Sequence, residues 1–346
     1  MKFGRMARSV VVGTIVAGFG MGAIGVAGAS TPEASKAKEK SLPAAQLNIV
    51  AYSTPTAAFA SLISAFQATT AGKNITFTQS YGASGDQTRA IIAGQKADIV
   101  DLSLQPDMQK LVDAGIVAPT WNQNKYKGFV TDSVAVIATR SGNPKNLKQW
   151  TDLTKSGVET ITPNPFTSGA AKWNILSAYG AQSNLGKNEQ AGLDYLTALF
   201  KQVPVQDTSG RAALTTFTSG KGDALITYEN EAILAKNAGQ PVDYTIPTKT
   251  LLIQNPAAVT KNSANPKQAK AFLDFLYSPR AAQIWAENGY RPVSDPALSA
   301  KQFKTPTGLF TIDDLGGWPT IDKAFFDPTA GKFTAIEKSL GVATSK

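Results

Sequence analysis

The sequence of 346 residues contains no cysteine and no histidine. Without cysteine the chain forms no disulfide, has no thiol nucleophile and cannot carry a lipid on a cysteine side chain. Without histidine it lacks the commonest metal ligand and the side chain that most often performs acid–base chemistry near neutral pH. We therefore expect no metal site, no cofactor and no catalytic residues, which excludes most classes of enzyme.

Acidic residues are fewer than basic ones, and the formal net charge is +9. The lysines are scattered along the chain and are not clustered with aromatic residues, which argues against nucleic-acid binding. A modest positive field would help to attract small anions, although the same charge can serve solubility alone. The hydrophobic content of 42% is enough for a sizeable core, and the length suggests two lobes of ordinary size.

The N-terminus has the pattern of a secretory signal peptide. Basic residues precede an apolar run at 10–26, and an A-x-A cleavage pattern follows at 27–29. A membrane anchor is the alternative, but the run is glycine-rich and shorter than the roughly 20 residues of a typical span. We expect residues 1–29 to be removed and residues 30–45 to form a flexible linker. The mature chain is then free in the periplasm or outside the cell, with no lipid anchor.

From residue 46 onward, short β-type runs alternate with helical ones, as they do in α/β proteins. Predicted strands at 47–52, 75–79 and 98–102 alternate with predicted helices, of which one contains residues 59–66, one lies at about 86–93, and one opens near residue 106 and ends before residue 115. Phe59, Leu62, Ile63 and Phe66 share one face of the first helix, which is typical of packing against a sheet. This alternation predicts parallel strands connected by helices.

Two later apolar segments, 133–139 and 251–259, are predicted to be strands that cross between two lobes. The fold class we predict is a two-lobed α/β fold, in which each lobe is a mostly parallel sheet flanked by helices. Residues 46–131 and 260–346 form the first lobe in this prediction, and residues 132–259 form the second. Two connections between lobes would act as a hinge, and ligand sites favour such clefts.

Three loops between a predicted strand and a predicted helix are rich in small residues and hydrogen-bond donors. They are QSYGASGDQ at 79–87, TPNPFTSGAAKWN at 162–174 and DTSGRAA at 207–213. Glycine permits a sharp turn, and the first N–H groups of a helix lack an intrahelical partner, so a helix N-terminus attracts anions. A serine-capped turn is the simpler explanation for each loop alone. Together, spread over both predicted lobes, the loops favour one small-anion site.

Several motifs resemble the periplasmic sulfate-binding proteins of ABC transporters. Besides the loops at 79–87 and 161–174, these are ALITYENEA at 224–232, GYRP at 289–292 and FTIDDLGGW at 310–318. The resemblance runs in order from about residue 46 to residue 318. It implies a type II periplasmic-binding-protein fold that captures sulfate, and in some members thiosulfate, through uncharged donors. It also implies delivery to membrane permease subunits, and we expect the protein to be a monomer.

The resemblance assigns the anion ligands motif by motif. The serine donor of the first loop falls on Ser84. In the second loop the ligands fall on Ser168, Gly169 and Ala170, where the family has glycine at the last position; a backbone N–H survives that change. The backbone donor of the third loop falls on Gly210, where alanine is usual in the family.

Further positions follow from the resemblance. Tyr228 stands where many members have a tryptophan whose indole N–H reaches the anion; a tyrosine hydroxyl donates instead, and a core aromatic is the alternative. Ser53 and Thr54 correspond to an early loop that contributes a backbone donor. Arg211 and Asp86 adjoin the loops and are expected to support them from outside the ring of ligands.

Selectivity among anions depends on the absence of hydrogen-bond acceptors. A site made only of donors leaves the proton of hydrogen phosphate unpaired, which disfavours phosphate. Asp86 would reverse this preference if it pointed inward, but an acid in a first helical turn usually faces solvent. Binding of molybdate, tungstate or phosphate is the alternative function. An exported Ser/Lys hydrolase is a weaker one, because its only S-x-x-K spacing, from Ser35 to Lys38, lies in the linker.

Overall fold

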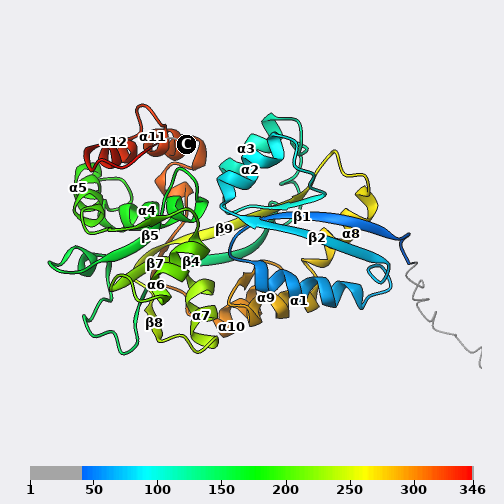
Figure 1. Cartoon of the computed structure of the whole chain (residues 1–346), viewed down its shortest axis with the longest axis horizontal. Coiled ribbons are helices and arrows are strands. Elements are labelled where there is room, and N and C mark those ends of the chain that lie inside the picture. The colour runs from blue at the N-terminus through cyan, green and yellow to red at the C-terminus, as the bar shows by residue number, and fades with distance from the viewer. Residues whose placement is uncertain (1–40, 345–346) are drawn as a thin grey trace, which may run out of the picture. The chain divides into compact units, whose positions relative to one another are not determined.

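The computed structural model in Figure 1 describes residues 41–344. The predicted signal peptide at 1–29 and most of the predicted linker at 30–45 lie outside the described residues. Within the described part of the chain, no helix is both long and apolar enough to cross a membrane.

The first group of elements alternates strands and helices as predicted. It contains β1 (Ala45–Tyr52), α1 (Thr56–Gln67), β2 (Ile75–Gly82), α2 (Ser84–Ile92), β3 (Ile99–Asp101) and α3 (Gln105–Asp113). Strand β1 lies between β2 and β3 and is parallel to both. The loops that follow these strands therefore emerge at one edge of the sheet, which is where ligand sites of α/β proteins form.

The core of this group is closed by two helices from late in the chain, α8 (Pro266–Phe275) and α9 (Pro279–Glu287). The predicted apolar face of α1 packs against them: Phe59 meets the Trp285 ring edge-on at 5.7 Å, and Phe66 meets Phe272 at 5.1 Å. Figure 1 shows α1 and α9 beside each other below the sheet. This packing fixes the start of α1, and with it the loop that precedes α1.

A second group of elements repeats the same arrangement. It contains the short helix η1 (Trp150–Thr154), β5 (Thr160–Pro163), α4 (Gly169–Gln182), α5 (Glu189–Phe200), β6 (Gln206–Asp207), α6 (Gly210–Thr218), β7 (Ala224–Tyr228), α7 (Glu229–Asn237) and β8 (Val242–Thr245). Strand β5 is parallel to both β6 and β7. Helices α4, α6 and α7 thus begin at the carboxyl ends of parallel strands.

Two long strands, β4 (Phe129–Arg140) and β9 (Lys249–Val259), connect the groups. They are antiparallel to each other, β9 also pairs with β3, and β4 also pairs with β7. The strand order is therefore β2-β1-β3-β9-β4-β7-β5-β6. The predicted fold class is confirmed: the protein has an α/β fold with two parallel segments joined by two crossing strands.

The C-terminal segment packs partly on each of the two groups of elements. It contains β10 (Arg291–Pro292), α10 (Pro296–Gln302), β11 (Gly308–Phe310), η2 (Asp313–Leu315), α11 (Trp318–Phe326) and α12 (Lys332–Ser339). Helices α11 and α12 pack on the second group: Trp318 meets Trp173 of α4 at 4.7 Å, and Phe333 meets Phe200 of α5 at 4.7 Å. Aromatic faces bury equally well on either group, so the pattern alone did not assign them. We propose a lobe boundary between α10 and β11.

Candidate anion-binding site

Loops from both groups of elements meet at the carboxyl ends of the parallel strands. The N–H of Gly85, in the first turn of α2, donates to the carbonyl of Thr167 just before α4, at 3.1 Å. A Cβ added to Gly210, at the start of α6, would lie 3.3 Å from the Ala170 Cβ and 3.5 Å from the Thr54 Cγ2. The N-termini of α2, α4 and α6 and the loop after β1 therefore surround one point, which we call the donor cluster.

The predicted backbone donors occupy the first positions of these helices. Ser84, Gly169 and Gly210 are the first residues of α2, α4 and α6, and Ala170 is the second residue of α4. N–H groups in a first turn have no intrahelical carbonyl to bind, and the helix dipole places partial positive charge on them. Helices α2 and α4 have no side-chain cap, whereas Ser209 caps α6 by accepting from Ala212 N at 3.2 Å. The cluster thus offers uncharged donors from three helices.

The Ser84 hydroxyl is engaged by protein groups. It donates to Asp107 Oδ2 at 2.7 Å and accepts from the Ser103 N–H at 3.1 Å. Asp107 is buried in the first turn of α3, and its other oxygen accepts from Lys110 Nζ at 3.0 Å. Because a hydroxyl carries one proton, Ser84 has only its backbone N–H left to donate to the cluster.

Tyr228 ends β7 and is buried beside the cluster. Its hydroxyl lies 2.7 Å from Ser103 Oγ. Burial raises the pKa of Tyr228 well above its ordinary value, so the hydroxyl keeps its proton and remains a donor. The carbonyl of Ser103 accepts from Trp173 Nε1 at 2.8 Å and from Asn255 Nδ2 at 3.0 Å. Ser103 therefore joins residues of both groups of elements.

The loop after β1 is held in place by Arg211 of α6. The guanidinium donates to Glu231 Oε2 and Oε1 at 2.8 and 2.7 Å, and to the carbonyl of Thr54 at 2.9 Å. Burial raises the pKa of Glu231, and the Arg211 guanidinium opposes that rise. Ser53 Oγ accepts from the Arg211 N–H at 3.4 Å, and the Thr54 hydroxyl lies 3.0 Å from the hydroxyl of Tyr290. Arg211 thus supports the loop by its hydrogen bond to the Thr54 carbonyl.

Asp86 lies away from the donor cluster. It forms an ion pair with Arg89 one turn along α2, and its side chain is 38% exposed. The acid beside the cluster is instead Asp107, which the sequence did not single out. Asp107 and Ser103 both follow β3, and that is the signal that could have found them: the loops after the neighbouring parallel strands β1 and β2 also carry candidate ligands.

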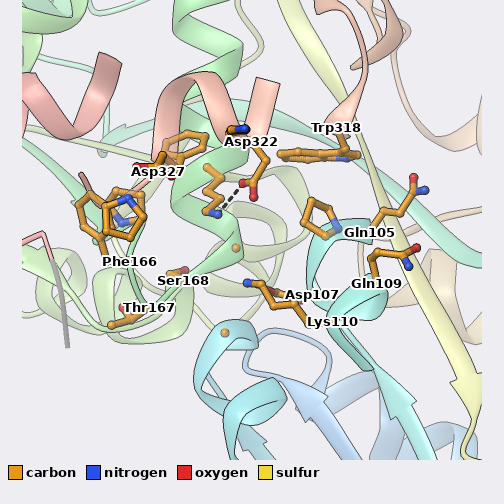
Figure 2. Close-up of a pocket in the computed structure, with 18 of the residues that line it drawn as sticks. Gln105, Asp107, Gln109, Lys110, Phe166, Thr167, Ser168, Trp318, Asp322 and Asp327 are labelled. Atoms are coloured by element: carbon orange, nitrogen blue, oxygen red, sulfur yellow. Dashed lines mark hydrogen bonds and ion pairs between the residues drawn. The ribbon is translucent and has the colours of Figure 1, made fainter. Parts of the chain in front are cut away.

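A cavity of about 590 Å³ borders the donor cluster. Figure 2 shows Ser168 at one wall, Asp107 and Lys110 at another, and Trp318 and Asp322 above them. Lys172 also lines the cavity, where its ammonium pairs with Asp322 at 2.6 Å. Ser168 is only 3% exposed. Since Ser168 and Gly169 line the cavity as well as belonging to the donor cluster, the two are adjacent.

The chain belongs to the family of bacterial extracellular solute-binding proteins, which matches residues 47–291. A sulfate-binding protein from Synechococcus elongatus is 40% identical over 85% of this chain and 87% of the relative. A thiosulfate-binding protein from Escherichia coli is 37% identical over 74% of this chain and 79% of the relative. The solved structure of the sulfate-binding protein SubI from Mycobacterium tuberculosis is 43% identical, with a TM-score of 0.80, over 82% of this chain and 99% of that chain. The suspected resemblance is confirmed: within the family, this chain groups with the sulfate-binding proteins.

Proposed function

We propose that this protein is an extracytoplasmic binding protein that captures sulfate, or thiosulfate, and delivers it to the permease of an ABC transporter. The observation that carries the proposal is the convergence of three helix N-termini, with small residues at their first positions, on one point. Sulfate is a dianion at neutral pH, and oriented N–H and O–H dipoles replace the water that it loses on binding. A site of this kind binds its ligand without changing it, so the proposal includes no catalytic role.

The proposed ligands are the N–H groups of the three first helical residues and of Ala170, together with the Ser168 hydroxyl. The Ser168 side chain does not cap α4, and the residue lines the cavity beside the cluster. Ser53, Thr54 and Tyr228 border the same point. No positive side chain is required at the anion, since Arg211 acts on the Thr54 carbonyl and on Glu231.

In this proposal the two groups of elements are lobes that move about β4 and β9. Donors from α2 belong to one lobe, and donors from α4 and α6 to the other. Bringing the lobes together completes the donor set, so the anion stabilises the closed form by its higher affinity for that form. A permease that recognises the closed form then distinguishes loaded from empty protein. The protein acts as a monomer in the periplasm or outside the cell, without a lipid anchor.

Binding of another oxyanion is the second candidate, and Asp107 is the relevant group. Hydrogen phosphate needs an acceptor for its proton, and Asp107 is the carboxylate beside the donor cluster. Both of its oxygens already accept hydrogen bonds, one from Ser84 and one from Lys110. This occupation favours sulfate over hydrogen phosphate. The Ser35–Lys38 pair, on which the alternative of a Ser/Lys hydrolase depends, lies outside the described residues.

Calorimetric titration of dialysed protein with sulfate, thiosulfate, molybdate, tungstate and phosphate tests the proposal. We expect tight binding of sulfate, little binding of phosphate, and a rise in the melting temperature with sulfate. Incubation with sulfate esters is expected to give no hydrolysis. Preferential binding of molybdate, tungstate or phosphate over sulfate would contradict the ligand assignment, and turnover of an ester would contradict the binding role.

A further inference from the structure

Ser103 lies where three of the proposed ligand segments meet. Its N–H donates to Ser84 Oγ at 3.1 Å, and its own Oγ lies 2.7 Å from the Tyr228 hydroxyl. A Cβ added to Gly169 would lie 2.7 Å from Ser103 Oγ, so the serine side chain rests against the N-terminus of α4. The residue is 1% exposed. Ser103 is therefore buried directly beside the donors of α2 and α4.

The Ser103 and Tyr228 hydroxyls bring two protons to one hydrogen bond. Ser103 Oγ lies 2.7 Å from the Tyr228 hydroxyl, and either oxygen can be the donor. Because each hydroxyl carries one proton, this bond uses one of the two and leaves the other. The Asn255 Nδ2 beside them donates to the Ser103 carbonyl at 3.0 Å, and the Asn255 Oδ1 accepts from Thr131 Oγ1 at 3.3 Å.

The second proton has no protein acceptor, since neither hydroxyl donates to any further group of residues 41–344. A buried hydroxyl proton without an acceptor destabilises the protein. Of the two oxygens, Ser103 Oγ is the one that lies against the N-terminus of α4. An anion held by the neighbouring N–H groups of Ser84 and Gly169 supplies the missing acceptor.

We propose that Ser103 is an additional ligand of the anion, and that Tyr228 is a positioning residue that directs the Ser103 hydroxyl toward it. The inference rests on the proposed function and assigns the donors of that site. In this arrangement Tyr228 donates to Ser103 Oγ, so Ser103 presents a proton to the anion and not a lone pair. This arrangement selects fully deprotonated oxyanions, such as sulfate, over hydrogen phosphate.

Calorimetry of Ser103→Ala, Tyr228→Phe and the double variant tests the assignment. Loss of a hydrogen bond to a charged group corresponds to roughly tenfold to 100-fold weaker binding, which we expect for Ser103→Ala. Tyr228→Phe keeps the Ser103 hydroxyl but removes the hydrogen bond that orients it. We expect a smaller loss of affinity, of about threefold to tenfold. The double variant is expected to bind as weakly as Ser103→Ala alone, because Tyr228 acts through Ser103.

Two readouts separate a ligand from a residue that only supports the fold. The sulfate-to-phosphate affinity ratio falls in Ser103→Ala if the lost group is a donor to the anion. The tryptophan fluorescence at saturating sulfate stays unchanged, because the Trp173 indole bonds to the Ser103 backbone carbonyl, which the substitution keeps. Ser177→Ala is the matched control: Ser177 is a buried serine of α4 whose hydroxyl has no partner within residues 41–344. If Ser103→Ala does not fold, Ser103→Gly also removes the hydroxyl and replaces it in the test.

Wild-type affinity in Ser103→Ala overturns the inference. A Tyr228→Phe loss that exceeds the Ser103→Ala loss, or losses that add in the double variant, also overturns it, because Tyr228 then contacts the anion itself. Either result leaves the proposed function intact if the unchanged protein binds sulfate tightly. Absence of sulfate binding by the unchanged protein instead refutes the proposed function.

Discussion

Replacing Gly169 by alanine would place a methyl group into space that is already filled. The added Cβ would lie 2.5 Å from Leu104 Cδ2, 2.7 Å from Ser103 Oγ and 2.8 Å from Ser103 Cβ. Non-bonded carbon atoms attract best at about 3.5–4.0 Å, so these contacts are strongly repulsive. Ser103 and Leu104 follow β3, whereas Gly169 begins α4. The clash therefore lies between the two proposed lobes.

A clash in this place penalises the closed form and spares the open one. Overpacking of a well-packed site costs about 1–3 kcal/mol, and about 1.4 kcal/mol is a tenfold change in affinity. We therefore expect Gly169→Ala to weaken sulfate binding by roughly fivefold to 150-fold. The stability of the ligand-free protein should fall by less, because opening of the cleft separates the clashing atoms.

Calorimetric titration with sulfate and thermal unfolding without ligand measure these two effects. Gly210→Ala is the matched control, because its added methyl would meet the Ala170 Cβ at 3.3 Å and the Thr54 Cγ2 at 3.5 Å, which requires only a small adjustment. We expect its affinity to change by less than about threefold, since nearly ordinary contacts cost little. Equal losses in the two variants, or wild-type affinity in Gly169→Ala, would refute the steric reasoning.

Three further changes test charged and titratable groups. Ser168→Asp places a carboxylate among the donors and is expected to abolish most sulfate affinity in calorimetry, while the uncharged Ser168→Asn should lose far less; equal losses would place the anion elsewhere. Asp107→Asn removes a negative charge beside the donors while keeping an oxygen that can accept from Ser84, so sulfate should bind more tightly in the same assay, and weaker binding would contradict this role. Burial raises the pKa of Asp132 from 3.8 to about 7. The folded protein then binds more protons than the unfolded chain across that window, so stability should fall as pH rises through it. Asp132→Asn should flatten this part of the profile in thermal unfolding at a series of pH values, and an unchanged profile would exclude the assignment.

The local pattern of the sequence was enough to predict the elements that present the ligands. The apolar face of α1, with Phe59 and Phe66 on one side, was predicted from helical spacing and is buried in the structure. The donor-rich loops were predicted to follow strands and to begin helices, and Ser84, Gly169 and Gly210 are indeed first helical residues. These features depend on neighbours in the chain, so spacing and residue type encode them.

Only the tertiary structure decided which groups reach the donor cluster and in which direction their protons point. Ser84 donates its hydroxyl to Asp107 instead of leaving it free, and Ser103 meets Tyr228 across 125 positions of sequence. Helices α11 and α12 pack on the second group through the rings of Trp173 and Phe200. Such outcomes depend on which surfaces meet when distant segments pack, and no residue's immediate neighbours in the chain carry that information.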